Sequence, residues 1–425
     1  MRLLTLALLL SAFAAPASAQ SPAPDMDALV ASVSEDVLAW RRDIHANPEL
    51  GNQEFRTAGI VAAHLESLGM EVHTGIAYTG VLGILRGGKP GKTVGLRADM
   101  DALPVTEQTG LSFASTVTTE FRGREVGVMH ACGHDTHVAI LMGVAEILAG
   151  RRDELTGNVM FIFQPAEEGG GGARLMLEEG LFDIMKPDAV FGLHVGPGQE
   201  AGKIGWVEHG AMAASDGLRI TVKGVQTHGA APWAGVDPIV VASQIVLGLQ
   251  TITSRQMEAT KAPTIVTIGS IQGGVRGNII PDEVEMVGTI RTLDTEMQDD
   301  VHRRVERTAK LIAESAGATA EVSIGRGYPV TYNDPDLTRA TVAYLEAALG
   351  AENVIQGRPV LGAEDFSYFA REVPGFYFWL GGRAPGTPIE EAAANHSPFF
   401  FVDEAALDVG VRAMTTAALS YLGQR

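Results

Sequence analysis

The sequence HACGHD at residues 130–135 contains the densest cluster of side chains that could take part in catalysis. Cys132 and His134 are two positions apart at the start of a predicted helix, so both side chains could face one metal ion. Thiolate and imidazole groups are good ligands for zinc and similar ions. This spacing alone is a weak metal pattern, and the same residues could simply form a well-packed entrance to a helix.

Two adjacent carboxylates, Glu167 and Glu168, follow an apolar stretch at residues 158–163. Neighbouring side chains point in different directions, so one carboxylate could bind a metal ion while the other transfers protons. Ligands of open α/β sheets bind beyond the carboxyl ends of the strands, which is where this pair is expected. Considered by itself, a pair of glutamates is most often an exposed acidic turn.

Two histidines complete a set of five candidate metal ligands. His194 lies at the end of an apolar stretch, and His396 lies in the sequence NHSP near the C-terminus. Each of them alone could be a structural histidine. Together with Cys132, His134 and Glu168 they are too many for one tetrahedral ion, and they suit two ions with open coordination positions.

A further carboxylate, Asp99, follows the apolar stretch 93–98. From the end of a neighbouring strand, it could accept a hydrogen bond from a ligand imidazole and so fix the orientation of that ring. A loop cap and a salt bridge are the alternative roles for this residue.

The elements that must position these residues alternate between strands and helices. Buried strands are predicted at 93–98, 158–163 and 189–195, and helical spacing is found at 138–148 and 173–179. The same pattern returns after residue 328, with helices predicted at 336–348 and near 403–422 and an apolar stretch at 376–380. This alternation predicts an α/β fold with a mainly parallel sheet that is covered by helices.

Between these two parts the pattern is different. Strands are predicted at 218–223, 264–271, 283–293 and 319–324, and helices at 238–252 and 295–316. The order β-α-β-β-α-β is that of a ferredoxin-like unit. We therefore predict a catalytic domain of residues 20–214 and 329–425, interrupted by an inserted α+β domain of residues 215–328.

Length and charge restrict the possible functions. The chain has 425 residues, of which 46% are hydrophobic, so more than one hydrophobic core is expected. Its net charge of −19 argues against nucleic acid as a partner, because phosphate-binding surfaces need an excess of Lys and Arg. The single cysteine, Cys132, has no partner for an intrachain disulfide.

Residues 1–19 have the pattern of a signal peptide. Arg2 is followed by an apolar stretch at 3–15, and the small residues ASA at 17–19 form a cleavage site. A buried first helix is the alternative interpretation. The apolar stretch is too short to span a bilayer, and no later stretch is both apolar and long enough. We therefore expect an exported protein, periplasmic or secreted, with no stable membrane insertion once the signal peptide is removed.

In their order along the chain, these motifs resemble those of the amidohydrolase branch of the aminoacylase/carboxypeptidase metallopeptidases. This branch includes hippurate hydrolases, bacterial N-acyl-amino-acid amidohydrolases and plant indole-acetyl-amino-acid hydrolases. The resemblance covers nearly the whole mature chain, from RRDIHANPELGNQEFRT at 41–57 to NHSPFFFVDE at 395–404. Between these two motifs lie GLRADMDALPV, MHACGHDTHVAILMG, FIFQPAEEGGGGA, GLHVGP, THGAAPWAGVDPI, GNIIPDEVEMVGTIRT and GAEDFSYF.

The resemblance implies a role for each residue of the catalytic domain that was singled out above. It implies two divalent metal ions, zinc or manganese, with five protein ligands: Cys132, His134, Glu168, His194 and His396. Cys132 corresponds to a bridging ligand, Glu167 to the general base, and Asp99 to an aspartate that supports the ligands. Arg97 occupies the position where the wider superfamily has a metal-binding histidine, as is usual in this branch.

The inserted domain corresponds to the family's lid, which in many members also forms a homodimer. His228 matches a histidine that helps to hold the scissile carbonyl. Asn278 and Arg291 match lid residues that hold the carboxylate of the substrate. Glu364 and Asp365 belong to a family motif near the active site, and the resemblance assigns them no role.

The sequence therefore predicts an exported, metal-dependent amidohydrolase that cleaves a small N-acyl amino acid with a metal-activated water and Glu167. A metal-dependent dipeptidase or carboxypeptidase that acts on small peptides is the alternative within the family. A cysteine hydrolase with Cys132 as nucleophile would leave Glu168, His194 and His396 unexplained. A non-catalytic binding protein on the same fold would have no need to retain both the ligands and the general base.

Overall fold

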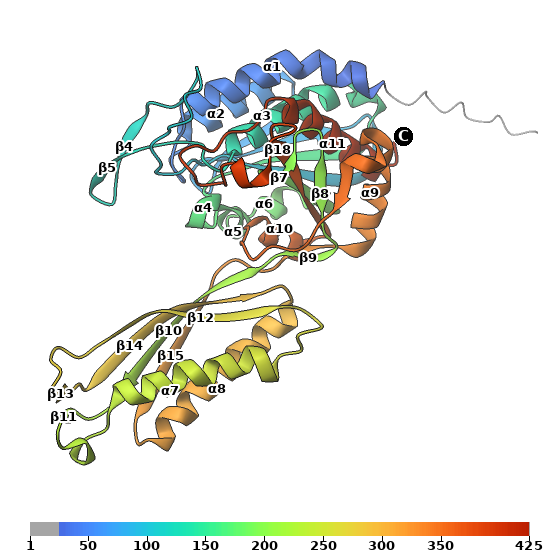
Figure 1. Ribbon diagram of the computed structural model, residues 1–425. Coiled ribbons are helices and arrows are strands. Elements are labelled where there is room, and N and C mark those ends of the chain that lie inside the picture. The colour runs from blue at the N-terminus through green and yellow to red at the C-terminus, as the bar shows by residue number, and fades with distance from the viewer. Residues whose placement is uncertain (1–24, 425) are drawn as a thin grey trace, which may run out of the picture.

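Eight strands form the larger sheet, in the order β1-β2-β6-β3-β7-β18-β8-β17 (Figure 1). The computed structural model describes residues 25–424, and the predicted signal peptide at residues 1–19 lies outside this range. The four strands at the centre of the sheet are parallel to one another, which confirms the predicted α/β fold with a mainly parallel sheet. The strands are β1 (Glu71–Ile76), β2 (Gly80–Arg86), β3 (Lys89–Asp99), β6 (Thr156–Gln164), β7 (Ala189–Glu200), β8 (Ile204–Trp206), β17 (Val354–Gln356) and β18 (Gly375–Arg383).

Helices cover both faces of this sheet. Along β6, Phe161 and Phe163 enter one hydrophobic core, and Met160 and Ile162 enter another on the opposite face. A strand that is buried on both faces must be apolar throughout, which explains the continuous apolar stretch in the sequence. The first face packs against α1 (Met26–Ala46), α2 (Phe55–Ser67), α3 (His134–Gly150), α9 (Pro335–Leu349) and α11 (Ala405–Tyr421). The second packs against α5 (Gly172–Glu178), α6 (Leu181–Ile184) and α10 (Phe366–Glu372).

The elements at residues 26–86 are ones that the sequence patterns did not assign. They comprise α1, α2, β1 and β2, and β1 and β2 form an antiparallel hairpin at one edge of the sheet. Within residues 25–424, none of the helices combines the length and the hydropathy needed to cross a membrane.

A second sheet of four antiparallel strands has the order β12-β14-β10-β15 and packs against two helices (Figure 1). Its elements follow one another in the predicted order β-α-β-β-α-β, which is that of a ferredoxin-like unit. They are β10 (Ala214–Lys223), α7 (Pro238–Thr251), β12 (Thr264–Gly273), β14 (Glu283–Thr292), α8 (Thr295–Ser315) and β15 (Thr319–Arg326). We call this part of the chain the lid, as its counterpart in the family is called.

Two connections join the lid to the larger domain, and they are hydrogen-bonded to each other. β9 (His209–Met212) leads into β10, and the chain that leaves β15 continues into β16 (Thr331–Asn333), which pairs with β9. The backbone N–H of Ser215 on the first connection donates to the carbonyl oxygen of Tyr328 on the second, at 2.9 Å. The opposite end of the lid contains the short pair β11 (Thr227–His228) and β13 (Ile279–Ile280) (Figure 1).

A network of buried charges fastens α1 to the start of α3. Nε of Arg41 donates to Oδ2 of Asp135 at 3.0 Å, and Nδ1 of His45 lies 2.8 Å from the same oxygen. Nε2 of His45 lies 3.1 Å from Oε1 of Glu107. Burial by itself would lower the pKa of His45, but the neighbouring carboxylates outweigh burial and raise this pKa to about 9. His45 is therefore a buried cation at neutral pH.

This network predicts a pH dependence of stability. Because the pKa of His45 is higher in the folded chain than its ordinary value of 6.5, its contribution is complete below pH 6.5 and is lost as the pH rises through about 9. Between pH 6 and pH 9.5, titration of His45 should lower the free energy of unfolding of the wild-type protein by up to about 3 kcal/mol, as measured by urea unfolding. His45→Gln should not show this part of the decrease. An equal loss in both proteins would show that His45 is not the group that titrates.

Candidate metal and catalytic site

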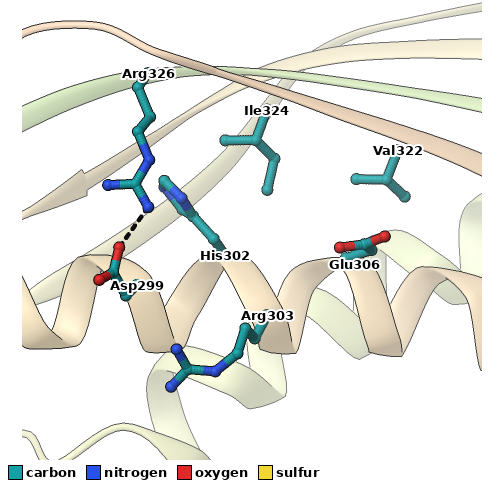
Figure 2. A pocket seen from close by; sticks show the side chains of 7 residues that line it. All are labelled: Asp299, His302, Arg303, Glu306, Val322, Ile324 and Arg326. Atoms are coloured by element: carbon teal, nitrogen blue, oxygen red, sulfur yellow. Dashed lines mark hydrogen bonds and ion pairs between the residues drawn. The ribbon is translucent and has the colours of Figure 1, made fainter.

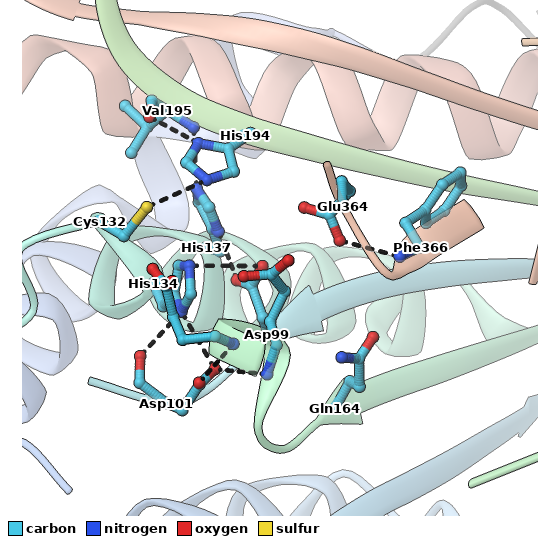
Figure 3. A network of polar contacts seen from close by, with 12 residues as sticks. Asp99, Asp101, Cys132, His134, His137, Gln164, His194, Val195, Glu364 and Phe366 are labelled. Atoms are coloured by element: carbon cyan, nitrogen blue, oxygen red, sulfur yellow. Dashed lines mark hydrogen bonds and ion pairs between the residues drawn. The ribbon is translucent and has the colours of Figure 1, made fainter. Parts of the chain in front are cut away.

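Five side chains from four separate segments meet at the carboxyl ends of the central strands. Figure 3 shows three of them, Cys132, His134 and His194. The ligand atoms of Cys132, His134 and His194 lie within 4.8 Å of one another, and so do those of Cys132, Glu168 and His396. Cys132 is the member that both groups share, which is the position expected of a bridging ligand. The structure thus brings together all five ligands that the sequence singled out.

The polar atoms of these side chains are arranged as metal ligands require. Nδ1 of His134 lies 2.8 Å from the carbonyl oxygen of Asp101, and Nδ1 of His194 lies 2.7 Å from that of Val195. Each ring therefore uses one nitrogen to bond the backbone, which fixes its tautomer and leaves Nε2 free for a metal ion. Nε2 of His134 is buried without any hydrogen-bond partner, and Nε2 of His194 lies 3.4 Å from Sγ of Cys132.

His396 reaches the ligand cluster from a loop after β18. Its backbone N–H donates to the carbonyl oxygen of Ala131 at 2.7 Å, and the preceding Asn395 donates to the carbonyl oxygen of Cys132 at 3.2 Å. Nε2 of His396 lies 2.9 Å from Oε1 of Glu168, yet this oxygen has no hydrogen bond of acceptable geometry. Two ligand atoms that face a common ion lie close without being aligned with each other.

The protonation states of the buried cluster also suit metal binding better than nucleophilic catalysis by cysteine. Burial raises the pKa of the Cys132 thiol to about 12, so without a metal ion this thiol is a poor nucleophile at neutral pH. Burial lowers the pKa of His194 to about 3, so its imidazole is neutral, as a metal ligand must be. The cysteine hydrolase alternative therefore lacks an activated thiolate.

Asp99 supports the cluster through a residue that the sequence analysis missed. Its carboxylate lies 2.5 Å from Nδ1 of His137 and only 3.7 Å from Nε2 of the ligand His134. Nε2 of His137 accepts a hydrogen bond from the backbone N–H of Val195 at 2.8 Å, beside the ligand His194. His137 thus links the end of β3 to the end of β7. Its position one helical turn after His134 is the signal that could have identified it.

Arg97 is completely buried beneath the cluster and compensates three carboxylates. Its guanidinium group donates to Asp99 at 2.7 Å, to Glu364 at 2.8 Å and to Asp365 at 2.9 Å. This contact gives Glu364 and Asp365, whose role the sequence left open, a structural function. Burial and the neighbouring Glu364 nevertheless hold the pKa of Asp365 well above its ordinary range.

Glu167 is buried next to the ligand Glu168 in a loop with an unusual backbone. Ala166, which precedes it, has a φ of 49°, and Gly169 has a φ of 82°. Two carboxylates hold this loop, because Glu54 accepts from the N–H of Ala166 at 2.9 Å and Asp101 accepts from the N–H groups of residues 167 and 168 at 3.0 and 2.9 Å. Burial and nearby carboxylates, chiefly Glu364, hold the pKa of Glu167 well above its ordinary range. Such a carboxylate takes up a proton readily.

The cluster opens into a cavity of about 540 Å³. Its polar wall contains four of the five ligands together with Glu167 and Glu364, and its other wall contains Met212, Tyr328, Val360 and Trp379. His134, the remaining ligand, lies beneath the cavity and is fully buried. A small organic molecule that enters this space meets the ligand atoms and the carboxylate of Glu167 on the same side.

The three lid residues named from the sequence do not line this cavity in the described structure. Arg291 on β14 lies directly opposite Ser215 on β10, and Ser215 is part of the cavity wall. Side chains opposite each other in an antiparallel pair share one face of the sheet, so Arg291 lies on the face that adjoins the cavity. His228 and Asn278 lie together near β11 and β13, at the end of the lid away from the ligand cluster (Figure 1).

A second hollow lies on the lid between α8 and the edge strand β15 (Figure 2). Asp299 forms an ion pair with Arg326 there, and His302 is directed to the buried carboxylate of Asp216, at 2.7 Å. The polar groups of this hollow are paired with one another.

Comparison with known proteins places this geometry in a family. The model of the peptidase family M20/M25/M40 matches residues 95–420. Thermostable carboxypeptidase 2 of Saccharolobus solfataricus is 41% identical, over 92% of this chain and 97% of that protein. N-acetyl-L-cysteine deacetylase of Bacillus subtilis is 36% identical, over 88% and 89%. A solved Bacillus subtilis structure, described as a dinuclear metal-binding peptidase of the M20 family, is 34% identical with a TM-score of 0.78, over 93% of this chain and all of that one.

The site predicts different effects for its two adjacent glutamates. Glu167→Gln should keep the metal content and reduce kcat about 100-fold or more, because the amide cannot accept a proton. Glu168→Gln, the matched control, should instead lower the metal content, which elemental analysis of the purified protein measures. Normal turnover in the Glu167 variant would exclude the base role.

Proposed function

This chain belongs to peptidase family M20/M25/M40, and on that premise we propose that it hydrolyses the amide bond of N-acyl amino acids. The family makes it a metal-dependent hydrolase, whereas the class of substrate is our proposal. The observation that supports it most is the position of the Glu167 carboxylate next to the cluster of five candidate ligands, four of which line one cavity together with Glu167.

Two divalent metal ions, zinc or manganese, fit the donor set of one thiolate, one carboxylate and three imidazoles. Cys132, His134, Glu168, His194 and His396 would hold them. When bound, such ions lower the pKa of water and polarise a carbonyl group. Between these two metals, the soft thiolate and the imidazoles favour zinc.

Glu167 performs the proton transfers of the proposed reaction. Its carboxylate takes a proton from the attacking water and then delivers it to the nitrogen of the leaving amine. Asp101 holds the backbone of Glu167 and Glu168 through two hydrogen bonds from one carboxylate, so the base and its neighbouring ligand keep a fixed separation. This arrangement supplies the orientation on which efficient proton transfer depends.

The substrate carboxylate is held by the lid in this proposal. Arg291 can bind a carboxylate through two parallel hydrogen bonds, and its strand partner Ser215, which lines the cavity, supports this role. His228 would hold the scissile carbonyl and Asn278 would assist Arg291. Because both of them lie at the far end of the lid, they reach a substrate only after the lid moves or when another copy of the chain supplies them.

A carboxypeptidase that acts on small peptides is the second candidate. The name of the Saccharolobus solfataricus relative favours it, whereas that of the Bacillus subtilis deacetylase favours an N-acyl amino acid. Both reactions release an amino acid with a free carboxylate, so the binding of that carboxylate is common to them. The apolar wall with Met212, Val360 and Trp379 suits an uncharged acyl group better than a charged peptide N-terminus.

We also propose export and self-association. The signal-peptide pattern of residues 1–19 supports a periplasmic or secreted location, which fractionation of cells that express the full chain would test. The strands β12 and β15 at the two edges of the lid sheet support a homodimer formed through the lid, because edge strands can pair with another chain. A monomer in light-scattering measurements at micromolar concentration would reject the dimer.

A hydrolysis screen of the metal-loaded mature protein tests the function. We expect turnover of N-acetyl and N-benzoyl amino acids at a higher kcat/KM than that of dipeptides, with loss of activity on chelation and recovery when zinc or manganese is added. Faster turnover of dipeptides would favour the carboxypeptidase, and activity that survives chelation would reject both candidates.

Arg291→Ala tests how the substrate is held. It should raise KM most for substrates with a free carboxylate, because only these lose two hydrogen bonds to the guanidinium group. The matched comparison is the same acyl amino acid as its neutral carboxamide. An equal change in KM for acid and carboxamide would contradict the assignment.

A further inference from the structure

The catalytic loop, defined as residues 165–172, is held from two sides. Glu54 and Asp101 bind its backbone N–H groups from the larger domain. A further contact comes from Tyr328, whose hydroxyl donates to the carbonyl oxygen of Glu167 at 2.5 Å and accepts from the N–H of Gly171 at 3.1 Å. One phenol group therefore spans the loop from the proposed base to the residue before α5.

Tyr328 lies on the connection by which the chain leaves the lid. β15 ends two residues earlier, and the carbonyl oxygen of Tyr328 accepts from the N–H of Ser215 on the other connection. Tyr368 of α10 packs edge-on against the Tyr328 ring, with centroids 6.1 Å apart, and its hydroxyl donates to the carbonyl oxygen of Gly327 at 3.1 Å. The backbone of Tyr328 thus belongs to the junction of the two domains, while its hydroxyl belongs to the catalytic loop.

The loop needs such external contacts because its own backbone is unfavourable. Ala166 has a positive φ of 49°, a value that a non-glycine residue rarely adopts, whereas Gly169 and Gly171, at 82° and 68°, are glycines that adopt such values without strain. Conformations of this kind persist only where the surroundings determine them. A contact that is lost on one side therefore lets the carbonyl of Glu167 turn, and with it the direction of the Glu167 side chain.

We propose that Tyr328 is a positioning residue that couples the lid connection to the proposed base, so that the lid sets the geometry of the catalytic loop. This inference rests on the proposed function of Glu167. Any rotation of the lid about its two connections moves the backbone of Tyr328. The hydroxyl transmits that movement to the carbonyl of Glu167 and to the N–H of Gly171.

Two other roles for Tyr328 have different consequences. As a substrate contact in the cavity wall, its hydroxyl would contribute to binding, and its removal would raise KM. As a packing residue of the domain junction, it would act through its ring, which phenylalanine retains. A positioning role affects kcat, because a small displacement of a catalytic group is costly even when substrate and metal ions still bind.

The test compares Tyr328→Phe with Tyr368→Phe in the metal-loaded mature protein. The control removes a hydroxyl that bonds the same connection at Gly327 but does not reach the catalytic loop. We expect Tyr328→Phe to lower kcat roughly tenfold or more, with KM within about twofold of wild type and an unchanged metal content. Tyr368→Phe should stay within about twofold of wild type in both constants.

Hydrogen–deuterium exchange gives a second measurement that needs no substrate. Peptides that cover residues 165–172 should exchange faster in Tyr328→Phe than in wild type or in Tyr368→Phe, because Gly171 loses the acceptor of its N–H. Unchanged exchange, an unchanged kcat, an increase confined to KM, or equal losses in both variants would overturn the inference. A wild-type protein without amidase activity but with faster exchange in Tyr328→Phe would reject the proposed function and retain the coupling.

Discussion

The site depends on the compensation of negative charge that is buried at the carboxyl ends of the central strands. Asp99, Glu364 and Asp365 are all buried there, and the guanidinium group of Arg97 contacts each of them. A buried carboxylate without a partner costs several kcal/mol, so these groups share one space with the help of a cation, and the raised pKa of Asp365 reduces the negative charge further. Arg97 is that cation beneath the candidate ligands, and this donor set could accept two divalent cations on the cavity side.

The same constraint determines how the backbone is used. The loop after β6 presents two adjacent carboxylates, the proposed base Glu167 and the candidate metal ligand Glu168. Some residues of this loop adopt left-handed conformations. Glu54 and Asp101 hold its N–H groups, and Asp101 also bonds the ligand His134 through its carbonyl oxygen. The proposed base, the candidate ligand His134 and the loop are therefore held by two residues, Glu54 and Asp101. A change at one of these partners acts on all three together.

Much of this arrangement could be predicted from the sequence, and the reasons are local. Glu168 and His194 follow or end apolar stretches, and parallel strands bring their carboxyl ends to one edge of the sheet, whereas Cys132 and His134 were recognised by their spacing at the start of a helix. The alternation of strands and helices, and its interruption by a β-α-β-β-α-β unit, predicted the two sheets.

The parts that could not be predicted depend on packing between distant segments. His137 donates to Asp99 because one turn of α3 lies beside the end of β3, which no local pattern indicates. The contacts of Arg97 with Glu364 and Asp365 join residues that are far apart in the chain. The distance between His228 and the candidate ligands depends on how the lid is oriented, and no sequence pattern predicts that orientation.

The strand order determines when during synthesis the larger sheet can be completed. β18 lies inside the larger sheet, between β7 and β8, yet the ribosome makes it only after the whole lid. The lid, whose sheet comes from one continuous stretch, can fold while its host is still incomplete. His396 follows β18, so no nascent chain shorter than almost the full length has the complete donor set. The group of candidate ligands that includes His396 is therefore completed late in synthesis, whereas Cys132, His134 and His194 all precede the lid.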